Sequence, residues 1–306
     1  MKYLNCPICG ADNHDVLYIA KDYNMKVGDK YEISKCKECN FIFLNFLPDA
    51  NKIKDFYPSN VYFDKTDLRL GNKLNILKKF TSARGKGRIL DVGCGYPLFL
   101  NSLKKEGWEV KGLDLSENVA RFALEDFGMK IDTEAITDIS YPENYFDVIT
   151  FWHSLEHIPD IKAVLSRIGG LLKKDGTLIV CVPNIDSIQA RIFKDKWYHL
   201  DVPRHLYHFS KYSLEYMFNR SGFLVKDINY HLFVDTYFGW MMSILNLLNF
   251  NIVNRAAFTE KLKDKKWLIS FIIKSIIVAP VMILSCLEEL SPGGASITAS
   301  FAKKNA

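Results

Sequence analysis

The sequence has little that would indicate a nucleic-acid-binding, repetitive or secreted chain. Its 306 residues carry a formal net charge of only +5, which is too small to indicate a nucleic-acid partner. It has no internal repeat and no low-complexity tract, so a solenoid or a disordered chain is excluded. The first residues, Met1–Cys6, lack the apolar core of a signal peptide. We therefore expect a cytoplasmic globular protein, as the 48% of hydrophobic and 25% of charged residues also indicate.

Disulfides are not indicated either, although the chain has seven cysteines. Four of them form two Cys-x-x-Cys pairs, which favour a metal over disulfides in a cytosolic chain. Each pair can hold one side of a tetrahedral ion, and four thiolates leave no open position. We predict a zinc-ribbon-like domain over residues 1–47 with a structural zinc. Redox-active dithiols and a knuckle without metal are the alternatives. The predicted ligands are Cys6, Cys9, Cys36 and Cys39.

The middle of the chain has the pattern of a nucleoside-binding turn. Ile89–Val92 is a short β-rich run, Gly93 and Gly95 follow it, and Pro97–Glu106 has helical spacing. A second strand then ends at Asp114. Glycines at a strand-to-helix turn let the backbone approach a ligand, and an acid about 20 positions further on can accept hydrogen bonds from ribose hydroxyls. This arrangement predicts a bound nucleoside.

Two details separate this turn from a dinucleotide-binding turn. Asp91 lies two residues before the first glycine, and Leu98 stands where a third glycine is expected. The run Leu90–Gly95 resembles motif I of the class I S-adenosylmethionine-dependent methyltransferases, and further motifs between residues 86 and 231 follow in that family's order. The resemblance implies S-adenosylmethionine as cofactor, with its ribose on Asp114. The cofactor-binding residues that it implies are Asp91, Gly93, Cys94, Gly95, Asp114, Leu115, Asp138, Ile139 and Trp152, of which Asp138 and Ile139 would flank the adenine.

The order of the elements predicts an α/β fold: a doubly wound, mostly parallel sheet of seven strands, as in Rossmann-like methyltransferases. The strands expected after the second are Met129–Thr133, Phe146–Trp152, Gly176–Val182, Phe223–Tyr230 and Ala295–Ala302. The resemblance places the last of these antiparallel at the sheet edge. We expect five segments: the ribbon at 1–47, a linker and N-terminal helix at 48–85, the catalytic core at 86–232, an apolar helical insert at 233–290, and the final strand at 291–306.

Polar residues just beyond the fourth strand are the best candidates for catalysis, because open α/β sheets bind ligands at the carboxyl ends of their strands. His153 and His157 are candidate bases for an acceptor that must lose a proton. The segment His153-x-x-Glu156-His157 also resembles a metal-binding motif of quinone-precursor O-methyltransferases, and a purely structural role is a third interpretation. Further along, the aromatic segment Trp197–Phe209 predicts an acceptor wall.

Within that aromatic segment, Arg204 could pair with an anionic group of the acceptor, and His205 is an alternative base. The segment could instead be a packed structural loop. A third interpretation is a metal set made by His199, Asp201, His205 and His208.

The insert at 233–290 is unusually apolar. Lys274 is the only charged residue in the segment Trp267–Leu287, and this segment is long enough to span a membrane. A single crossing between two strands of one sheet is excluded, because both strands lie on the same side of a membrane. A helical hairpin or two interfacial helices remain, with the basic connection Arg255–Lys266 facing anionic lipid at the inner face of the membrane. The alternatives are a homodimer interface or a lid over the acceptor.

Two further segments precede the core. The stretch Pro48–Asp67 is linker-like, and we expect it to pack between domains; the alternative is that it closes over the cofactor, as an aromatic segment before the first helix does in related enzymes. The next stretch has Leu70, Leu74 and Leu77 on one helix face, with basic residues that we expect to be solvated, Lys73 among them.

We conclude from the sequence that the chain is an enzyme, a methyltransferase that uses S-adenosylmethionine. Its acceptor would be a small molecule, a sugar or a lipid-linked precursor, methylated on oxygen, nitrogen or carbon, and no nucleic acid is involved. Two alternatives stay open. The first alternative is a catalytically silent scaffold, because Tyr96-Pro97 stands where the family usually has a small residue of the cofactor loop. The second alternative is an NAD-dependent oxidoreductase.

Overall fold

The computed structural model describes residues 5–25, 30–46, 56, 66–81, 86–248, 278–290 and 293–304. The chain divides into two compact units that each combine segments distant in the sequence. Unit 1 comprises Met1–Val61, Pro183–Ser210 and Tyr230–Ser296. Unit 2 comprises Tyr62–Val182, Lys211–Asn229 and Ile297–Ala306.

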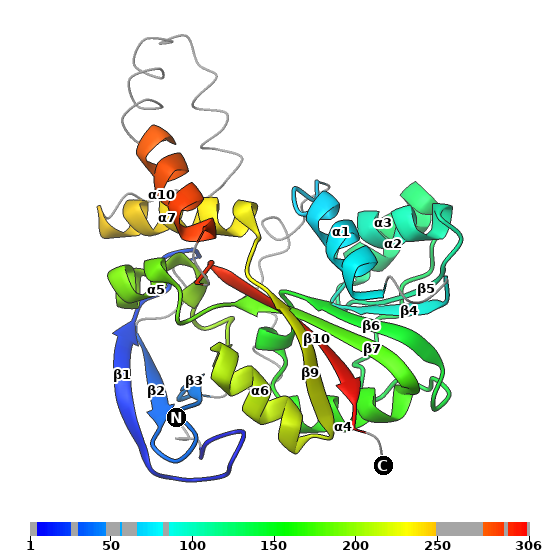
Figure 1. Cartoon of the computed structure of the whole chain (residues 1–306), viewed down its shortest axis with the longest axis horizontal. Coiled ribbons are helices and arrows are strands. Elements are labelled where there is room, and N and C mark those ends of the chain that lie inside the picture. Colours follow the sequence, from blue (N-terminus) through cyan, green and yellow to red (C-terminus); the bar gives the residue numbers. More distant parts are fainter. Residues whose placement is uncertain are drawn as a thin grey trace. The chain divides into compact units, whose positions relative to one another are not determined.

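Unit 2 is built on a six-stranded sheet in the order β5-β4-β6-β7-β10-β9 (Figure 1). The strands are β4 (Arg88–Val92), β5 (Glu109–Leu113), β6 (Phe146–Trp152), β7 (Leu172–Pro183), β9 (Phe223–Asn229) and β10 (Ser296–Lys303). β4 pairs in parallel with β5 and β6, β6 pairs in parallel with β7, and β10 runs antiparallel to β9. The predicted α/β fold with a mostly parallel sheet is confirmed.

Helices cover both faces of this sheet, α1, α2 and α3 on one face and α4 and α6 on the other (Figure 1). They are α1 (Leu70–Thr81), α2 (Leu98–Lys105), α3 (Glu117–Phe127), α4 (Ile161–Leu171) and α6 (Lys211–Arg220). The cover explains why β6 is an almost continuous apolar run: a strand buried on both faces has no solvated side. Phe146, Val148 and Phe151 are fully buried. Ser116 caps α3, since its Oγ accepts the N–H of Val119.

The sheet differs from the prediction in two places. The expected strand Met129–Thr133 is reduced to one parallel bridge between Leu113 and Asp132. It contributes two backbone hydrogen bonds, from Asp114 N to Asp132 O and from Asp132 N to Gly112 O, both at 3.0 Å. A ladder this short leaves six strands instead of seven. The last strand, β10, lies between β7 and β9, so β9 and not β10 forms the edge.

Unit 1 contains a second, antiparallel sheet in the order β1-β2-β3-β8. Its strands are β1 (His14–Ala20), β2 (Tyr31–Cys36), β3 (Ile42–Leu44) and β8 (Tyr207–His208). β3 pairs with β2 on one side and with β8 on the other, and Phe43 is fully buried.

Among its described residues, unit 1 has the helices α5 (Ile188–Phe193), α7 (Phe233–Leu247) and α10 (Ala279–Glu289). Glu288 of α10 is buried and joins the three helices, because its carboxylate accepts the side-chain N–H groups of Gln189 in α5 and Trp240 in α7 at 3.0 and 2.6 Å. Burial raises the pKa of Glu288.

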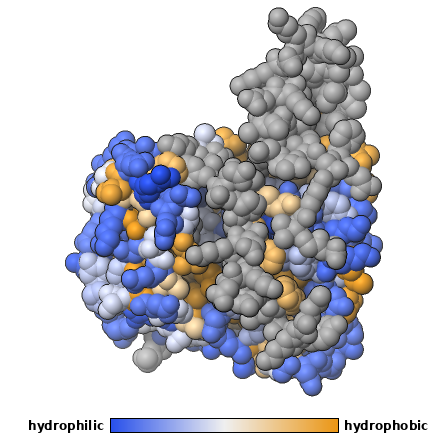
Figure 2. All heavy atoms as spheres, turned by 180° about the vertical axis from the view of Figure 1, so that it is seen from behind, coloured by the Kyte–Doolittle hydropathy of each residue, from blue (hydrophilic) through white to orange (hydrophobic). Residues whose placement is uncertain are grey.

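Three expectations fall wholly or mostly on residues outside the described ranges. They are the basic connection Arg255–Lys266, the apolar segment Trp267–Leu287, of which residues 267–277 lie outside, and most of the linker Pro48–Asp67. Among the described residues no helix reaches the length and hydropathy needed to cross a membrane. On the face seen in Figure 2, the described surface is mainly hydrophilic, with hydrophobic residues in small patches.

Candidate active site

The turn between β4 and α2 requires glycine at its first position. Gly93 has a φ of +71°, and a Cβ added there would lie 2.5 Å from Ser154 Cβ. Its N–H donates to Leu113 O at 2.7 Å, and the N–H of Cys94 donates to the same oxygen at 3.0 Å. These bonds join the turn to the end of β5. Gly95 has a φ of +56°, and nothing lies within 4 Å of a Cβ built there. The second glycine therefore borders open space, as a backbone that approaches a ligand requires.

Asp114 closes this turn from the end of β5. Its Oδ2 accepts the N–H of Gly95 and its Oδ1 accepts the N–H of Ser116, both at 2.9 Å. Burial raises the pKa of Asp114, and these two backbone donors counteract that rise. A carboxylate has about four acceptor sites, so ribose hydroxyls can still donate to it. The position and chemistry of Asp114 fit a nucleoside, and Leu115 next to it is exposed.

Asp91 lies beneath the turn as a buried carboxyl. Its Oδ1 accepts the hydroxyl of Thr150 at 2.7 Å. Burial raises the pKa of Asp91 to about 6, although the charge of Lys73 and the Thr150 hydroxyl bond act in the opposite direction. The Asp91 carboxyl therefore changes its protonation state near pH 6, well above the range of an ordinary aspartate.

Lys73 of α1 is the residue that the sequence analysis missed. We expected a solvated side chain, but its ammonium donates to Asp67 Oδ2 at 2.9 Å, and the two side chains are only 12% and 14% exposed. The ammonium also lies 5.9 Å from the ring centres of Phe99 and Trp152. The signal was in the spacing, because Lys73 is three residues after Leu70 and four before Leu77 and so lies on the apolar face.

The other predicted cofactor residues lie at the same end of the sheet or in the turn after α3. Trp152 ends β6, is buried, and packs edge-on against Phe99 with ring centres 5.8 Å apart. Burial raises the pKa of the Cys94 thiol well above its usual value. Asp138 and Ile139 both donate their N–H groups to Ala135 O, at 2.9 and 3.1 Å. Asp138 is exposed, whereas Ile139 is buried.

The predicted catalytic residues of unit 2 follow β6 directly. His153 has a φ of +53° and lies beside Cys181 of β7, with 3.4 Å between Nε2 and Sγ. Its Nδ1 is 3.5 Å from Oε1 of the fully buried Glu156. His157 is half-buried and its N–H donates to Ser154 O at 3.2 Å. The sheet therefore brings two imidazoles and a carboxylate to the edge where open α/β sheets bind ligands.

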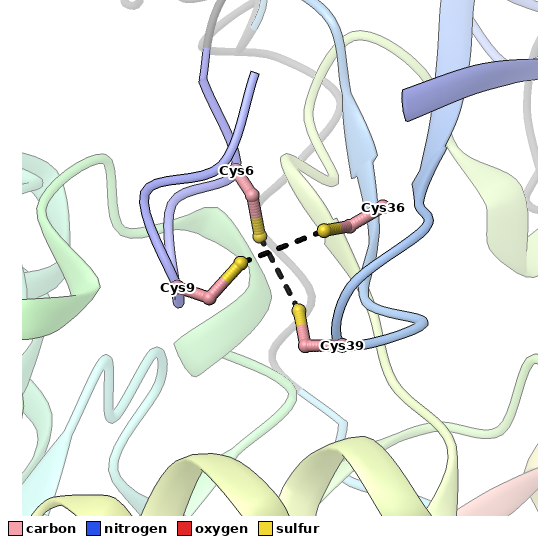
Figure 3. A group of neighbouring side chains, drawn as sticks. All are labelled: Cys6, Cys9, Cys36 and Cys39. Carbon is pink, nitrogen blue, oxygen red and sulfur yellow. Dashed lines mark hydrogen bonds between the residues drawn. The ribbon is translucent and has the colours of Figure 1, made fainter. Parts of the chain in front are cut away.

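The four predicted metal ligands converge in unit 1 (Figure 3). Their sulfurs lie within 4.8 Å of one another, and the pairs Cys6–Cys39 and Cys9–Cys36 are each 3.5 Å apart. A tetrahedral ion with Zn–S bonds of about 2.3 Å needs sulfurs about 3.8 Å apart. Gly10 and Asn40, each just after a Cys-x-x-Cys pair, have positive φ values of 82° and 57°. The donor set fits a zinc ion with no open position.

Arg204 has a different environment from the one we expected. Its guanidinium is fully buried and binds Asp22 through NH1 and NH2, at 2.9 and 2.6 Å, and Asp201 through Nε and NH2. Asn24 also donates to Asp201. Although burial raises it, the charges of Arg204 and His205 hold the pKa of Asp201 well below its usual range. Two carboxylates of unit 1 already neutralise Arg204, so we correct the expectation that it pairs with an anionic acceptor.

His205 is held by the same part of unit 1. Its Nδ1 lies 2.8 Å from His199 O and its Nε2 lies 3.7 Å from Asp201 Oδ2. Among the described residues, the suggested metal set of His199, Asp201, His205 and His208 does not converge as a group of ligand atoms. His205 stays a candidate base.

Together, the glycine turn, the acid at the end of the next strand and the strand order define the Rossmann-like fold of class I S-adenosylmethionine-dependent methyltransferases. Comparison with protein families agrees with this class. The model of the methyltransferase domain family matches residues 66–227, and the chain belongs to this family.

Relatives of this chain include several ubiquinone biosynthesis O-methyltransferases. The protein of Actinobacillus pleuropneumoniae serotype 7 (strain AP76) is 34% identical over 119 residues, which cover 36% of this chain and 50% of the relative. The protein of Yersinia enterocolitica is 37% identical over 95 residues, or 29% of this chain and 39% of the relative. The chain therefore spans about half the length of these relatives or less.

Solved structures agree on the fold. A methyltransferase described as SAM dependent, from Archaeoglobus fulgidus, has a TM-score of 0.50 at 20% identity, over 77% of this chain and 93% of that one. The cyclase SpnF also has a TM-score of 0.50, at 18% identity, over 77% of this chain and 81% of that one. At these identities the likeness shows the fold alone, and the name of the second protein illustrates that the fold does not fix the reaction.

Proposed function

We propose that the protein transfers a methyl group from S-adenosylmethionine to a hydroxyl oxygen of a small molecule. The observation that carries the proposal is the Asp114 carboxylate, held by the N–H groups of Gly95 and Ser116 at the end of β5. The names of the O-methyltransferase relatives support oxygen as the methylated atom. A sugar or a lipid-linked precursor could carry this hydroxyl.

The chain's own residues divide the work of binding. Asp114 would accept the ribose hydroxyls, while Gly93 and Gly95 keep the backbone close to the ligand. Lys73 would attract the carboxylate of the methionine part, because it is a largely buried cation beside Trp152. Asp138 and Ile139 would flank the adenine. When bound, S-adenosylmethionine supplies an electrophilic methyl group, and the binding residues orient it toward the acceptor.

An acceptor hydroxyl must lose its proton, and an imidazole that titrates near neutral pH is suited to take it. We propose His153 or His157 as this base, since both follow β6, with His205 of unit 1 as the alternative. A divalent cation held by His153, Glu156 and His157 is not needed for this step.

The function is tested first by calorimetric titration with S-adenosylhomocysteine and NAD. We expect S-adenosylhomocysteine to bind with a micromolar Kd, which corresponds to a binding free energy of about −8 kcal/mol. We expect no binding of NAD. Asp114→Ala should abolish binding, whereas Glu125→Ala, which changes an exposed acid on α3, should not. Binding of NAD alone would favour an oxidoreductase. Binding of neither would favour the scaffold alternative.

We also propose a structural zinc on Cys6, Cys9, Cys36 and Cys39, supported by their convergence in unit 1. Metal analysis of the purified protein should find zinc equimolar with the chain. Cys39→Ser should lose the zinc, and Cys286→Ser, which changes an exposed thiol on α10, should retain it. A wild-type protein with far less than equimolar zinc would refute the site.

The domain boundaries at residues 47, 85, 232 and 290 stay part of this proposal, as does a contact of the 233–290 insert with lipid or with a second copy. The exposed side chains of Ile283, Leu287 and Leu290 support such a contact. Sedimentation with anionic liposomes and the mass in solution separate the two partners. A monomer that ignores liposomes would refute both.

A further inference from the structure

His153 lies between two buried side chains where β6 and β7 end. Cys181 Sγ is 3.4 Å from its Nε2, and Glu156 Oε1 is 3.5 Å from its Nδ1. The backbone is tied to the same neighbour, since His153 N donates to Cys181 O at 2.9 Å. The side chain of His153 is 15% exposed, whereas Glu156 is fully buried and Cys181 nearly so. One imidazole thus connects a buried thiol, a buried carboxyl and the surface.

The backbone of His153 indicates that this placement is imposed by its surroundings. Its φ of +53° is in the left-handed region, which costs a side-chain-bearing residue roughly 1–2 kcal/mol. Such conformations persist only where neighbouring structure holds them, and they are frequent at functional sites. The turn after β6 therefore keeps the ring against Cys181 and Glu156 at some cost in stability.

The chemistry of the three groups selects one tautomer. An ionised carboxylate can only accept hydrogen bonds, while a thiol is a weak donor and a weak acceptor. With Glu156 ionised, the ring N–H is therefore better placed on Nδ1, facing Glu156, than on Nε2, facing sulfur. This leaves the lone pair of Nε2 directed at the S–H group of Cys181.

We propose that Glu156 and Cys181 are positioning residues that hold His153 as the Nδ1–H tautomer and keep its Nε2 ready to accept a proton. This inference rests on the proposed methyl transfer and selects His153 over His157 as the base. The hydrogen bond from the Cys181 thiol to Nε2 is weak, so the hydroxyl of an acceptor, which is a stronger donor, can replace the thiol.

The proton and electron balance of the step is complete with these groups. The acceptor oxygen bonds to the methyl carbon while the carbon–sulfur electron pair returns to the donor sulfur. Nε2 of His153 takes the hydroxyl proton, and the resulting imidazolium is stabilised by the Glu156 carboxylate. Among hydroxyl acceptors, phenols and enols lie closest in pKa to an imidazole, so we expect them to give up their proton to His153 most readily.

The test uses the full chain labelled with 15N-histidine and needs no acceptor. Nitrogen chemical shifts distinguish the two tautomers, and His153→Gln assigns the signal among the seven histidines. We expect the Nδ1–H form in the wild type. Glu156→Leu should turn it into a mixture of tautomers, and Glu156→Gln, which restores an acceptor, should recover it. An Nε2–H form in the wild type, or no change in Glu156→Leu, would overturn the inference.

The role of Cys181 is tested with matched variants. Cys181→Ala should move the Nε2 signal toward that of a free lone pair, and Cys181→Ser should restore a hydrogen-bonded signal. Cys286→Ala, on α10, should leave the spectrum unchanged. A Cys181→Ala spectrum identical to wild type would refute the role of the thiol.

Binding of S-adenosylhomocysteine, measured on the same samples, reports separately on the proposed function. If the wild type did not bind S-adenosylhomocysteine, the methyltransferase proposal would be refuted, while the tautomer result would still decide the proposal on His153. Binding of S-adenosylhomocysteine by the Cys181 variants would show that these variants are folded.

Discussion

Gly95 donates its backbone N–H to Asp114 Oδ2 at 2.9 Å, and this bond joins the loop after β4 to the end of β5. The two residues are 19 positions apart in the sequence, yet the parallel pairing of β4 with β5 brings them together. The bond sets the carboxylate beside the glycine turn before any ligand binds. Preorganisation of this kind lowers the cost of binding.

Two Gly→Ala changes, one in the turn after β4 and one in α1, should have opposite effects on stability. Gly93→Ala should lower the free energy of unfolding by about 2–4 kcal/mol, because of its positive φ and the 2.5 Å contact with Ser154 Cβ. Gly71→Ala is the control: it lies in α1 with nothing within 4 Å of a Cβ, and it should stabilise by about 0.5–1 kcal/mol. Urea unfolding measures both. A neutral Gly93→Ala would contradict the close approach of turn and loop.

Asp91 predicts a pH dependence of stability. Its pKa is about 6 in the folded chain, against an ordinary value of 3.8. Below about pH 4 the carboxyl is protonated in both states, and between about pH 4 and 6 only the unfolded chain releases the proton. The free energy of unfolding should therefore fall by up to about 3 kcal/mol as the pH rises from about 4 to about 6.

The matched variant for this prediction is Asp91→Asn, which keeps the shape and cannot ionise. Its stability relative to wild type should rise from about pH 4 to pH 6 and then level off. Urea denaturation at a series of pH values measures this difference. A difference independent of pH would mean that the Asp91 carboxyl is not desolvated.

Much of the site could be read from the sequence, because its signals are local. The glycine turn and Asp114 each depend on a few adjacent residues, and the structure has them at the predicted positions. Lys73 could have been assigned from its spacing to Leu70 and Leu77, but Arg204 could not. The environment of Arg204 depends on Asp22, which is 182 positions away, and no periodicity reports such a pairing. The missing seventh strand is similar, since ladder length depends on tertiary pairing.

Lys73 predicts a specific loss of cofactor affinity. Lys73→Ala removes a largely buried cation, and we expect binding of S-adenosylhomocysteine to weaken about tenfold or more, as the loss of a charged hydrogen bond implies. Lys78→Ala, five residues along the same helix and mostly exposed, is the control. Calorimetry compares the two. Equal affinities in both variants would leave Lys73 with a purely structural role.

Arg204 predicts a large effect on stability. Arg204→Leu leaves two buried carboxylates without their cation, and such a change typically costs about 3–5 kcal/mol. Arg191→Leu changes an exposed arginine on α5 of the same unit and should be nearly neutral. Thermal unfolding of both variants gives the comparison. A stable Arg204→Leu variant would show that the ion cluster contributes little.

The central claim is that the turn after β4 and Asp114 hold the nucleoside of S-adenosylmethionine. A crystal structure of the full chain with S-adenosylhomocysteine tests it most directly. We predict both ribose hydroxyls within hydrogen-bond distance of the Asp114 carboxylate and the methionine carboxylate beside Lys73. A nucleoside bound elsewhere, with Asp114 facing solvent, would contradict the account.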